Sequence, residues 1–470
     1  MATTFDEAFQ SRKTGFIGNS PTRRLNDQTA NLLLLVIGVA VIPYASVRPF
    51  FWALWALVFG GISLWYFAVL YARDYKLRRP LSSFRMLLLP FGTVAGWMAL
   101  QMLPIGSFSG LSTFTTQTGA EIRSATLSIS PSDSFLALLR WLTYGAIFFL
   151  VTQVSVRKGR ARYMLWVLLM IVVAQALYAF VSLYYLGDAL LVADKTKYFG
   201  DATGTFLNRN SLATYLAFGA VIATALSIPS TTAEHYRDQG SAARSSSRRA
   251  GGFTSQNLYA IAGLAIIFAA LMATHSRMGV LAAMGGVLAT LLIRLQTNRT
   301  RLIAVFLAAI AAGLSFVIYG EGLLDRLFNI NRDTVWRFHL YDQVWQMIGD
   351  RPLLGFGADS FVQAFPLYHA PPVPTDLTFY KAHSTYLANW LELGVVIGTL
   401  PVLIVGICLT YLLKKVFINN DRRTETCVAI GVIVVAALHS VFDFSLEIEA
   451  VTMLFTALIA LGTSDALETR

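Results

Sequence analysis

Long apolar stretches, separated by short polar segments, follow one another along almost the whole chain. Each has enough residues to cross a hydrocarbon layer of roughly 30 Å as an α-helix. The pattern predicts twelve membrane helices, near residues 31–48, 50–72, 86–104, 134–154, 163–186, 211–229, 257–274, 278–296, 302–320, 385–413, 425–441 and 447–463. We therefore expect an all-α polytopic membrane protein whose two ends lie on the same side of the bilayer.

Two polar segments divide this series of helices. Residues 230–256 are rich in Ser, Gly and Arg, which is typical of a flexible linker, whereas residues 321–383 are aromatic enough to bury side chains and fold. The expected organisation is an N-terminal segment 1–30, a first transmembrane half 31–229, the linker 230–256, helices seven to nine at 257–320, the folded loop 321–383, and a last part 384–470 with three helices and a short tail.

One helix is expected inside the folded loop. Trp336, Leu340, Val344 and Met347 recur at spacings of four and three residues, and the pattern stops before Pro352. This spacing places the apolar side chains on one face, so the helix should lie on the membrane surface or on the transmembrane bundle.

The lysines and arginines orient the chain. With the N-terminus in the cytoplasm, 25 of the 37 fall in cytoplasmic segments, and every short basic cluster lies on that face. Positively charged short loops are retained in the cytoplasm. Both termini are therefore predicted to be cytoplasmic, and the loop 321–383 to lie on the opposite side.

Composition agrees with this reading. The chain is 56% hydrophobic and 13% charged, with a mean hydropathy of +0.58. A net charge of +11 is compatible with nucleic-acid binding, but the basic residues sit in short loops where topology explains them, so we expect no nucleic-acid partner. Cys408 and Cys427 fall in or beside apolar runs, which indicates packing rather than a disulfide or a thiolate metal site.

Few cations remain on the outer face, and three of them adjoin predicted spans or the loop helix. Arg209 precedes a span, Arg277 lies in a short turn between two spans, and Arg337 belongs to the loop helix. An anionic ligand at the membrane boundary would explain them, because a guanidinium group binds phosphate and carboxylate in a bidentate manner. The alternative is snorkelling or an interaction with a helix end.

His383 stands at the entrance of a predicted span, near the outer boundary. A neutral imidazole there could take a proton from a sugar hydroxyl, although a lone interfacial histidine also serves as a hydrogen-bonded structural group. His439 and Asp443 are four residues apart and can share a helix face, for which structural pairing is the simpler interpretation. The histidines have no metal-type spacing, so no metal site is expected.

Glycines in the segment RPLLGFGADSF (351–361) allow a tight turn close to a ligand or a helix end. The segment does not have the full spacing and surroundings of a dinucleotide-binding motif, and no P-loop pattern occurs in the chain. Nucleotide chemistry is not indicated, and no cofactor is expected.

Several motifs, taken in order, resemble the O-antigen ligase and polymerase superfamily of bacterial membrane glycosyltransferases. The resemblance covers roughly 200–445 and consists of GTFLNRNSLATY, SRMGV, RDTVWRFHLYDQVW, RPLLGFGADSF, HSTYLANWLELG and HSVFDFSL. Many members of that superfamily have Asn after the histidine, where this chain has Ser384.

The resemblance implies an all-helical, GT-C-like enzyme of the bacterial inner membrane that acts without a metal. Its donor would be a glycan on undecaprenyl diphosphate, and its acceptor a hydroxyl of a glycan or of the lipid A core. Carried onto this chain, Arg277 and Arg337 would bind the diphosphate and His383 would be the base. Residues expected to contact substrate are Arg209, Asn210, Tyr341, Ser384 and Asp443.

The sequence leaves several functions open. Ligation to a lipid A core and polymerisation of repeat units are not separated by any motif, and polysaccharide assembly proteins are possible partners. A lipid-linked oligosaccharide transporter or flippase would also have about twelve spans, but its polar sites usually lie near mid-membrane. A non-catalytic component of an assembly complex is the third alternative. Because the unusual residues gather at the outer boundary, the sequence favours interfacial chemistry over transport. The resemblance implies a transferase that produces surface polysaccharide, and direct displacement by the acceptor predicts inversion at the anomeric carbon.

Overall fold

The computed structural model describes residues 21–105, 113–115, 119–191, 195–229, 254–295 and 332–467, with the side chains of Pro21 and of 332–335 left aside. The span expected at 302–320 and most of the linker expected at 230–256 lie outside the described residues.

The described part of the chain is helical apart from one short hairpin. The helices are α2 (Pro21–Ala40), η1 (Tyr44–Ser46), α3 (Pro49–Ala72), η2 (Leu81–Phe84), α4 (Arg85–Gln101), α6 (Pro131–Val154), α7 (Lys158–Tyr185), α8 (Arg209–Ser227), α10 (Ser255–Ala273), α11 (Arg277–Arg294), α13 (Arg332–Asp350), α14 (Phe361–Ala364), η4 (Phe365–Leu367), α15 (Thr385–Leu393), α16 (Val395–Phe417), α17 (Thr424–His439), η5 (Ser445–Glu447) and α18 (Glu449–Thr463). The antiparallel strands β1 (Thr113–Thr115) and β2 (Glu121–Arg123) pair with Phe114 opposite Ile122.

Eight of the described helices are long and apolar enough to cross a membrane: α3, α4 with η2, α6, α7, α8, α10, α11 and α16. The apolar helices α17 and α18 are shorter. The predicted all-α polytopic membrane fold is confirmed. The predicted number of twelve spans is not reached within the described residues, and α2 is not among the eight.

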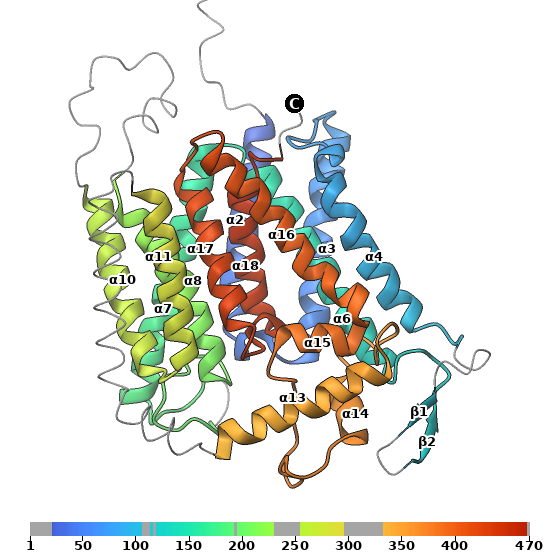
Figure 1. Ribbon diagram of the computed structural model, residues 1–470. Helices are drawn as coiled ribbons and strands as arrows, with labels where there is room; N and C mark the ends of the chain where they lie inside the picture. The colour runs from blue at the N-terminus through green and yellow to red at the C-terminus, as the bar shows by residue number, and fades with distance from the viewer. Residues whose placement is uncertain are drawn as a thin grey trace, which may run out of the picture.

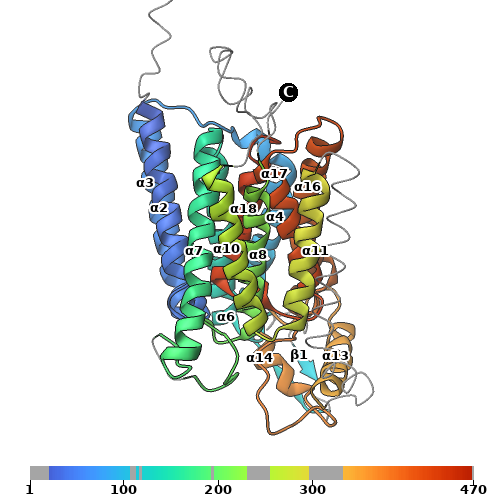
Figure 2. The ribbon, with the colours of Figure 1, turned by 90° about the vertical axis from the view of Figure 1, so that its left-hand side faces the viewer.

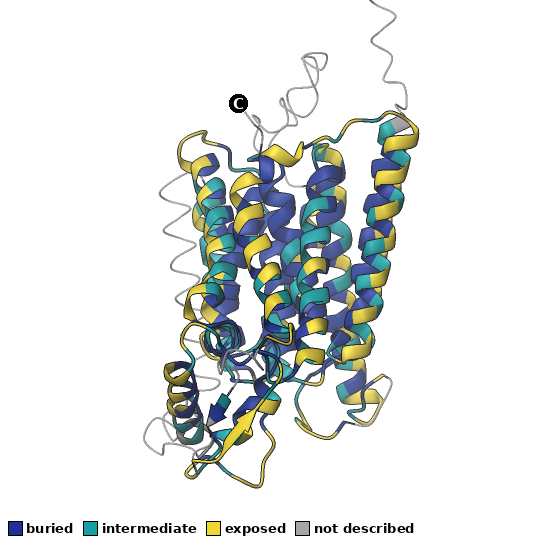
Figure 3. Ribbon diagram, turned by 90° about the vertical axis from the view of Figure 1, so that its right-hand side faces the viewer, coloured by how far each residue is buried: buried dark blue, intermediate teal, exposed yellow. Residues whose placement is uncertain are grey.

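The long helices run roughly alongside one another (Figures 1 and 2), and α8 is the most buried of the eight candidate spans. Side chains from Ser211 to Leu226 of α8 are all buried, and α8 packs against α7, α10, α11 and α17. By contrast α3, α4 and α16 alternate between buried and exposed apolar residues, which appears as yellow bands on their outer surfaces (Figure 3). This distribution is expected of helices that face lipid on one side.

Small residues bring α11 and α17 together. A Cβ added at Gly286 would lie 2.7 Å from the carbonyl oxygen of Gly431, and one added at Gly431 would lie 3.0 Å from that of Gly286. Such contacts allow membrane helices to approach closely. They fix the first residue of α11, Arg277, relative to the end of α17 and the Asp443 that follows it.

The helices α13, α14 and α15 and the two strands cover one end of the bundle, which we call the α13 end (Figure 1). Helix α13 confirms the helix predicted in the loop, and its Leu340, Val344 and Met347 are fully buried against α15 and its surroundings. The single span predicted at 385–413 is wrong in one respect. Gly394, with φ +78°, ends α15 and starts α16, so α15 lies across the end of the bundle instead of continuing the span.

The glycine motif packs against this break. Backbone N–H groups of Phe356 and Gly357 donate to the carbonyl oxygens of Leu391 and Glu392, at 2.9 Å each. These carbonyls belong to the last turn of α15, where a carbonyl oxygen has no N–H partner within its own helix. Of the two interpretations left open for the glycines, the structure supports contact with a helix end.

The opposite end of the bundle gathers the basic loops. Arg160 of α7 contacts Asp27 of α2, and Arg79 and Arg423 both contact Asp465, just beyond α18. Ion pairs here join segments almost four hundred residues apart in sequence. We call this the basic end.

Candidate active site

His383 lies at the α13 end, in the non-helical turn between the loop and α15. Its φ of +56° is left-handed, and its carbonyl oxygen accepts a hydrogen bond of 2.9 Å from the Tyr341 hydroxyl on α13. Its ring lies between Trp336 and Phe444, with ring centroids 5.7 and 5.2 Å away and both contacts edge-on. Helix α13 and the segment after α17 therefore hold the imidazole from two sides.

The surroundings keep this imidazole neutral. Burial lowers the pKa of His383 to about 4, and the positive charge of Arg337 acts in the same direction, whereas Asp443 opposes both. The Nδ1 atom is buried and has no hydrogen-bond partner among the described residues. At neutral pH this nitrogen can therefore exchange a proton only with a group that enters the site.

Arg337 contributes its charge to several groups at this site. It lies close enough to Tyr341 and Tyr198 to influence both as well as His383. Burial raises the pKa of Tyr341 to about 12, with Arg337 opposing, so this hydroxyl stays protonated and keeps its bond to the His383 carbonyl. The structure thus brings Arg337, Tyr341 and His383 together.

Two helices begin with an arginine at this same end. Arg277 is the first residue of α11, capped by the Ser276 side chain, and Arg209 is the first residue of α8, capped by Asn208. A positive side chain at a helix N-terminus adds to the positive end of the helix dipole, which favours an anion nearby.

A chain of polar contacts joins these two helix starts to Asp443. The Ser276 hydroxyl donates to Asn210 Oδ1 at 2.9 Å, and Asn210 Nδ2 donates to Asp443 Oδ1 at 3.4 Å. Ser445 donates to the other oxygen of Asp443. The structure places Asn210 and Asp443 together, and their polar atoms bond to other protein groups.

Arg209 is also engaged within the protein. Its guanidinium lies 2.6 Å from Asp201 and 5.4 Å from the centre of the Tyr198 ring. Asp201 also contacts His275 Nδ1 at 2.7 Å. Arg209 is thus paired with a carboxylate. It differs in this from Arg337, which has no carboxylate partner among the described residues.

Ser384 has a structural position. Its hydroxyl donates to the Ser440 carbonyl oxygen at 3.2 Å, and the N–H of Thr385 donates to the same oxygen at 3.1 Å. These bonds attach the start of α15 to the end of α17. His439 Nδ1 and Asp443 Oδ2 are buried 3.6 Å apart, so their pairing is a buried local contact at the end of α17. Thr214 Oγ1 of α8 lies 3.0 Å from the same nitrogen and links this pair to the neighbouring helix.

The sequence analysis missed several residues around the site. Trp336 and Phe444, which enclose the His383 ring, were read only as apolar positions. It also missed a group of buried charges near Lys381, which contacts Asp359 and Glu447. Two signals were available: Lys381 is two residues before His383, and Asp359 directly follows the glycine motif.

Within the described residues, no group of three or more His, Cys, Asp or Glu side chains is arranged to hold a metal ion. Two charged groups influence the pKa of His383, the Arg337 guanidinium and the Asp443 carboxylate.

Residues 262–403 match a family model described as O-antigen ligase. The chain carries an O-antigen ligase domain. This match confirms the resemblance to the O-antigen ligase and polymerase superfamily, whose activity is broadly that of a membrane glycosyltransferase. No curated protein matches the chain.

The O-antigen ligase domain contains part of the site just described. The candidate residues inside it are Arg277, Arg337, Tyr341, His383 and Ser384. Arg209 and Asn210 precede it, and Asp443 follows it. Helix α8 and the segment after α17, which lie outside the matched residues, therefore supply the remaining candidate residues.

Proposed function

We propose that this protein transfers a glycan from undecaprenyl diphosphate to an acceptor hydroxyl at the non-cytoplasmic face of the bacterial inner membrane. The observation that carries the proposal is the neutral, enclosed imidazole of His383 beside the Arg337 guanidinium. The product would belong to a surface polysaccharide, made by ligation to a lipid A core or by polymerisation of repeat units.

His383 is the proposed base. Its neutral nitrogen would take the proton of the acceptor hydroxyl while that oxygen attacks the anomeric carbon of the donor. The bond between the anomeric carbon and the diphosphate oxygen breaks at the same time, so the configuration inverts. His383 thus holds the acceptor proton, the acceptor oxygen gains the bond to the anomeric carbon, and the diphosphate leaves with the electrons of the broken bond.

Arg337 and Arg277 are proposed to stabilise the leaving diphosphate. Negative charge grows on that group as the glycosidic bond breaks, and guanidinium groups in a partly dehydrated site stabilise it without a metal. The N-terminus of α11 adds to the positive potential at Arg277. Arg209 is already paired with Asp201, so we propose that it contributes less to binding the diphosphate.

A bound diphosphate would also improve the base. In the substrate-free site, burial and the Arg337 charge hold the pKa of His383 low, which makes it a weak base. A bound anion compensates the positive charge of Arg337 and raises that pKa. Donor binding would thus increase the basicity of His383 just before proton transfer.

Asn210, Asp443 and Ser384 are proposed to position these groups. Their polar atoms are occupied by one another, by the Ser276 and Ser445 hydroxyls, or by a backbone carbonyl, as described above. Tyr341 acts in the same way, through its bond to the His383 carbonyl. We propose the same division of the chain as before, with 321–383 as the loop that carries part of the site.

The test is product analysis with purified protein in lipid nanodiscs and a synthetic lipid-linked oligosaccharide. We expect a new glycosidic bond in the wild type, and at least ~100-fold slower transfer for His383→Ala and Arg337→Ala, the usual effect of removing a general base or an oxyanion donor. Chain growth without added lipid A core identifies a polymerase, and strict dependence on the core identifies a ligase.

Two variants serve as controls. His339 lies on α13 but is half exposed beside Asp342, and Arg123 is exposed on β2, so His339→Ala and Arg123→Ala should retain transfer. Normal transfer by His383→Ala would refute the catalytic assignment. Movement of the lipid-linked oligosaccharide across the membrane without a new bond would instead indicate a flippase.

A further inference from the structure

Lys381 is a largely buried lysine two residues before His383, in the segment that leads from the loop into α15. Its Nζ atom lies 2.5 Å from Asp359 Oδ1 and 3.1 Å from Glu447 Oε2. None of these three charged side chains is more than 15% exposed. One ammonium group therefore joins two carboxylates from distant parts of the chain, in surroundings where water screens their charges little.

The first of these carboxylates is held in place by α15. Asp359 lies in the glycine segment 351–361, two residues after Gly357, and its N–H donates to Glu392 Oε2 at 2.7 Å. The Gly357 N–H donates to the carbonyl oxygen of the same glutamate at 2.9 Å. Both the side chain and the backbone of Glu392, in the last turn of α15, thus fix the segment that carries Asp359.

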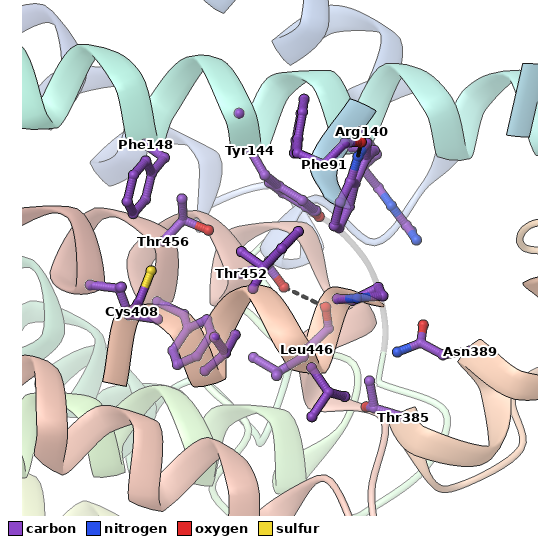
Figure 4. Close-up of a pocket in the computed structure, with 18 of the residues that line it drawn as sticks. Phe91, Arg140, Tyr144, Phe148, Thr385, Asn389, Cys408, Leu446, Thr452 and Thr456 are labelled. Atoms are coloured by element: carbon purple, nitrogen blue, oxygen red, sulfur yellow. Dashed lines mark hydrogen bonds between the residues drawn. The ribbon is translucent and has the colours of Figure 1, made fainter. Parts of the chain in front are cut away.

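The second carboxylate is held in place by α6 and α18. Arg140 Nη1 donates to the carbonyl oxygen of Glu447 at 3.3 Å, and the Thr452 hydroxyl donates to the carbonyl oxygen of Leu446. Arg140, Leu446 and Thr452 line one pocket, in which Figure 4 shows the bond between Thr452 and Leu446 as a dashed line. Glu447, the last residue of η5, therefore belongs to a segment attached to two helices of the bundle.

The segment that reaches His383 from the loop has few other polar attachments. Within the described residues, no backbone group of 378–382 makes a hydrogen bond with another backbone group. Phe379 and Ala382 are buried among apolar side chains, and Tyr380 is exposed. Apolar contacts are not directional, whereas charge-assisted hydrogen bonds fix the geometry of both partners. Lys381 is therefore the group that can fix this side of the turn.

We propose that Lys381 is a positioning residue for the base His383. Its ion pairs with the two carboxylates keep the imidazole in its enclosed position beside Arg337. This inference rests on the proposed transferase function and adds a residue on which the base depends. Only Ala382 separates the lysine from the histidine, so a displacement of one moves the other. A misplacement of about 1 Å can slow catalysis about 100-fold.

Kinetics of Lys381→Met and Glu447→Gln test the proposal in the lipid-linked oligosaccharide assay. The first removes the ammonium group and should lower kcat about 100-fold, and the second removes one carboxylate partner and should lower it about tenfold. KM for the donor should stay unchanged, because the arginines proposed to bind the diphosphate lie on α11 and α13. Glu447→Gln leaves the lysine paired with Asp359, so it provides the test if Lys381→Met does not fold. Unchanged kcat in Glu447→Gln would overturn the proposal.

The pH–rate profile separates displacement of the ring from a direct effect of charge. Arg337 and Asp443 influence the pKa of His383, and the Tyr341 hydroxyl bonds to its carbonyl oxygen. A ring that leaves its enclosure regains water, so its pKa should rise from about 4 towards 6.5 and the acid limb of kcat/KM should move to higher pH. In Glu447→Gln a direct effect would have the opposite sign, because a negative charge is lost. A limb that stays in place or moves to lower pH would overturn the proposal.

Two further lysine variants are controls. Lys415 is also buried and lies 3.9 Å from Asp421, but it belongs to the basic end, so Lys415→Met should leave the acid limb in place. An equal shift in Lys415→Met and Lys381→Met would show that loss of any buried lysine has this effect, and would overturn the proposal. Lys381→Arg keeps the charge and can donate to both carboxylates, so it should restore much of the kcat lost in Lys381→Met.

Chemical modification measures the position of the ring without turnover. Diethyl pyrocarbonate acylates neutral imidazole, and mass spectrometry of the peptides follows each histidine. His383 should react several-fold faster in Lys381→Met and Glu447→Gln than in the wild type, whereas the half-exposed His339 should react at the same rate in all three. Equal rates for His383 would overturn the inference, and the transferase function would still stand if the wild type forms product. Faster modification, with no product from the wild type, would instead refute the proposed function.

Discussion

At the scale of single residues, the environment of His383 sets how the site responds to pH. Burial and Arg337 both disfavour the imidazolium, so the pKa of this residue falls from 6.5 to about 4. The neutral form, which can accept a proton, therefore persists when the pH drops below 6.5. The acid limb of kcat/KM, which reports the free enzyme, should have its midpoint near pH 4.

Replacement of Arg337 tests the cause of this shift. Arg337→Gln removes a repelling cation, so the pKa of His383 should rise and the acid limb should move to higher pH, although the rate itself falls. Normalised pH–rate profiles in the lipid-linked oligosaccharide assay measure this. Arg123→Gln, at an exposed position, is the control. A limb that stays in place or moves to lower pH would contradict the assignment.

At the scale of elements, one glycine fixes the α13 end to the bundle. Gly357 has φ +110°, and a Cβ there would lie 2.0 Å from Ser128 Oγ and 2.9 Å from Ser128 Cα. Gly357→Ala should therefore destabilise the protein by about 1–3 kcal/mol, the usual cost of such backbone strain, and more if Ser128 cannot move.

Thermal unfolding of the purified protein measures this effect. The matched control is Gly349→Ala on α13, where an added Cβ meets no atom within 4 Å, and where alanine is favoured over glycine in a helix by up to about 1 kcal/mol. Equal unfolding temperatures for Gly357→Ala and the wild type would show that the close approach of this segment to Ser128 is not required.

At the scale of the whole molecule, the two ends of the bundle should face different compartments. The basic end should be cytoplasmic, because positively charged loops are retained there. Cysteines introduced at the exposed positions Asp74, near the basic end, and Tyr380, at the α13 end, test this with a membrane-impermeant maleimide on intact cells.

Tyr380→Cys should react without permeabilisation, and Asp74→Cys only after it. The native Cys408 and Cys427 are 1% and 0% exposed, so the unsubstituted protein should give little background. The reverse labelling pattern would place the α13 end, and with it His383, in the cytoplasm, where a donor flipped to the outer leaflet is absent.

The sequence by itself determined the all-helical membrane class, the approximate position of most spans, and the loop helix that carries Arg337. It did so because apolar length and helical spacing are local properties of the chain. It also pointed to His383 as a candidate base and, through ordered motifs, to the O-antigen ligase domain.

Tertiary structure alone decided the break at Gly394, the pairing of Arg209 with Asp201, and the enclosure of His383 by Trp336 and Phe444. Tertiary structure likewise decided that Lys381, Asp359 and Glu447 form one buried group of charges. An apolar run reports that a segment enters the membrane, but every one of its faces is apolar, so it does not identify its neighbours. The pKa of a histidine or the partner of an arginine depends on those neighbours, which here come from helices far apart in sequence.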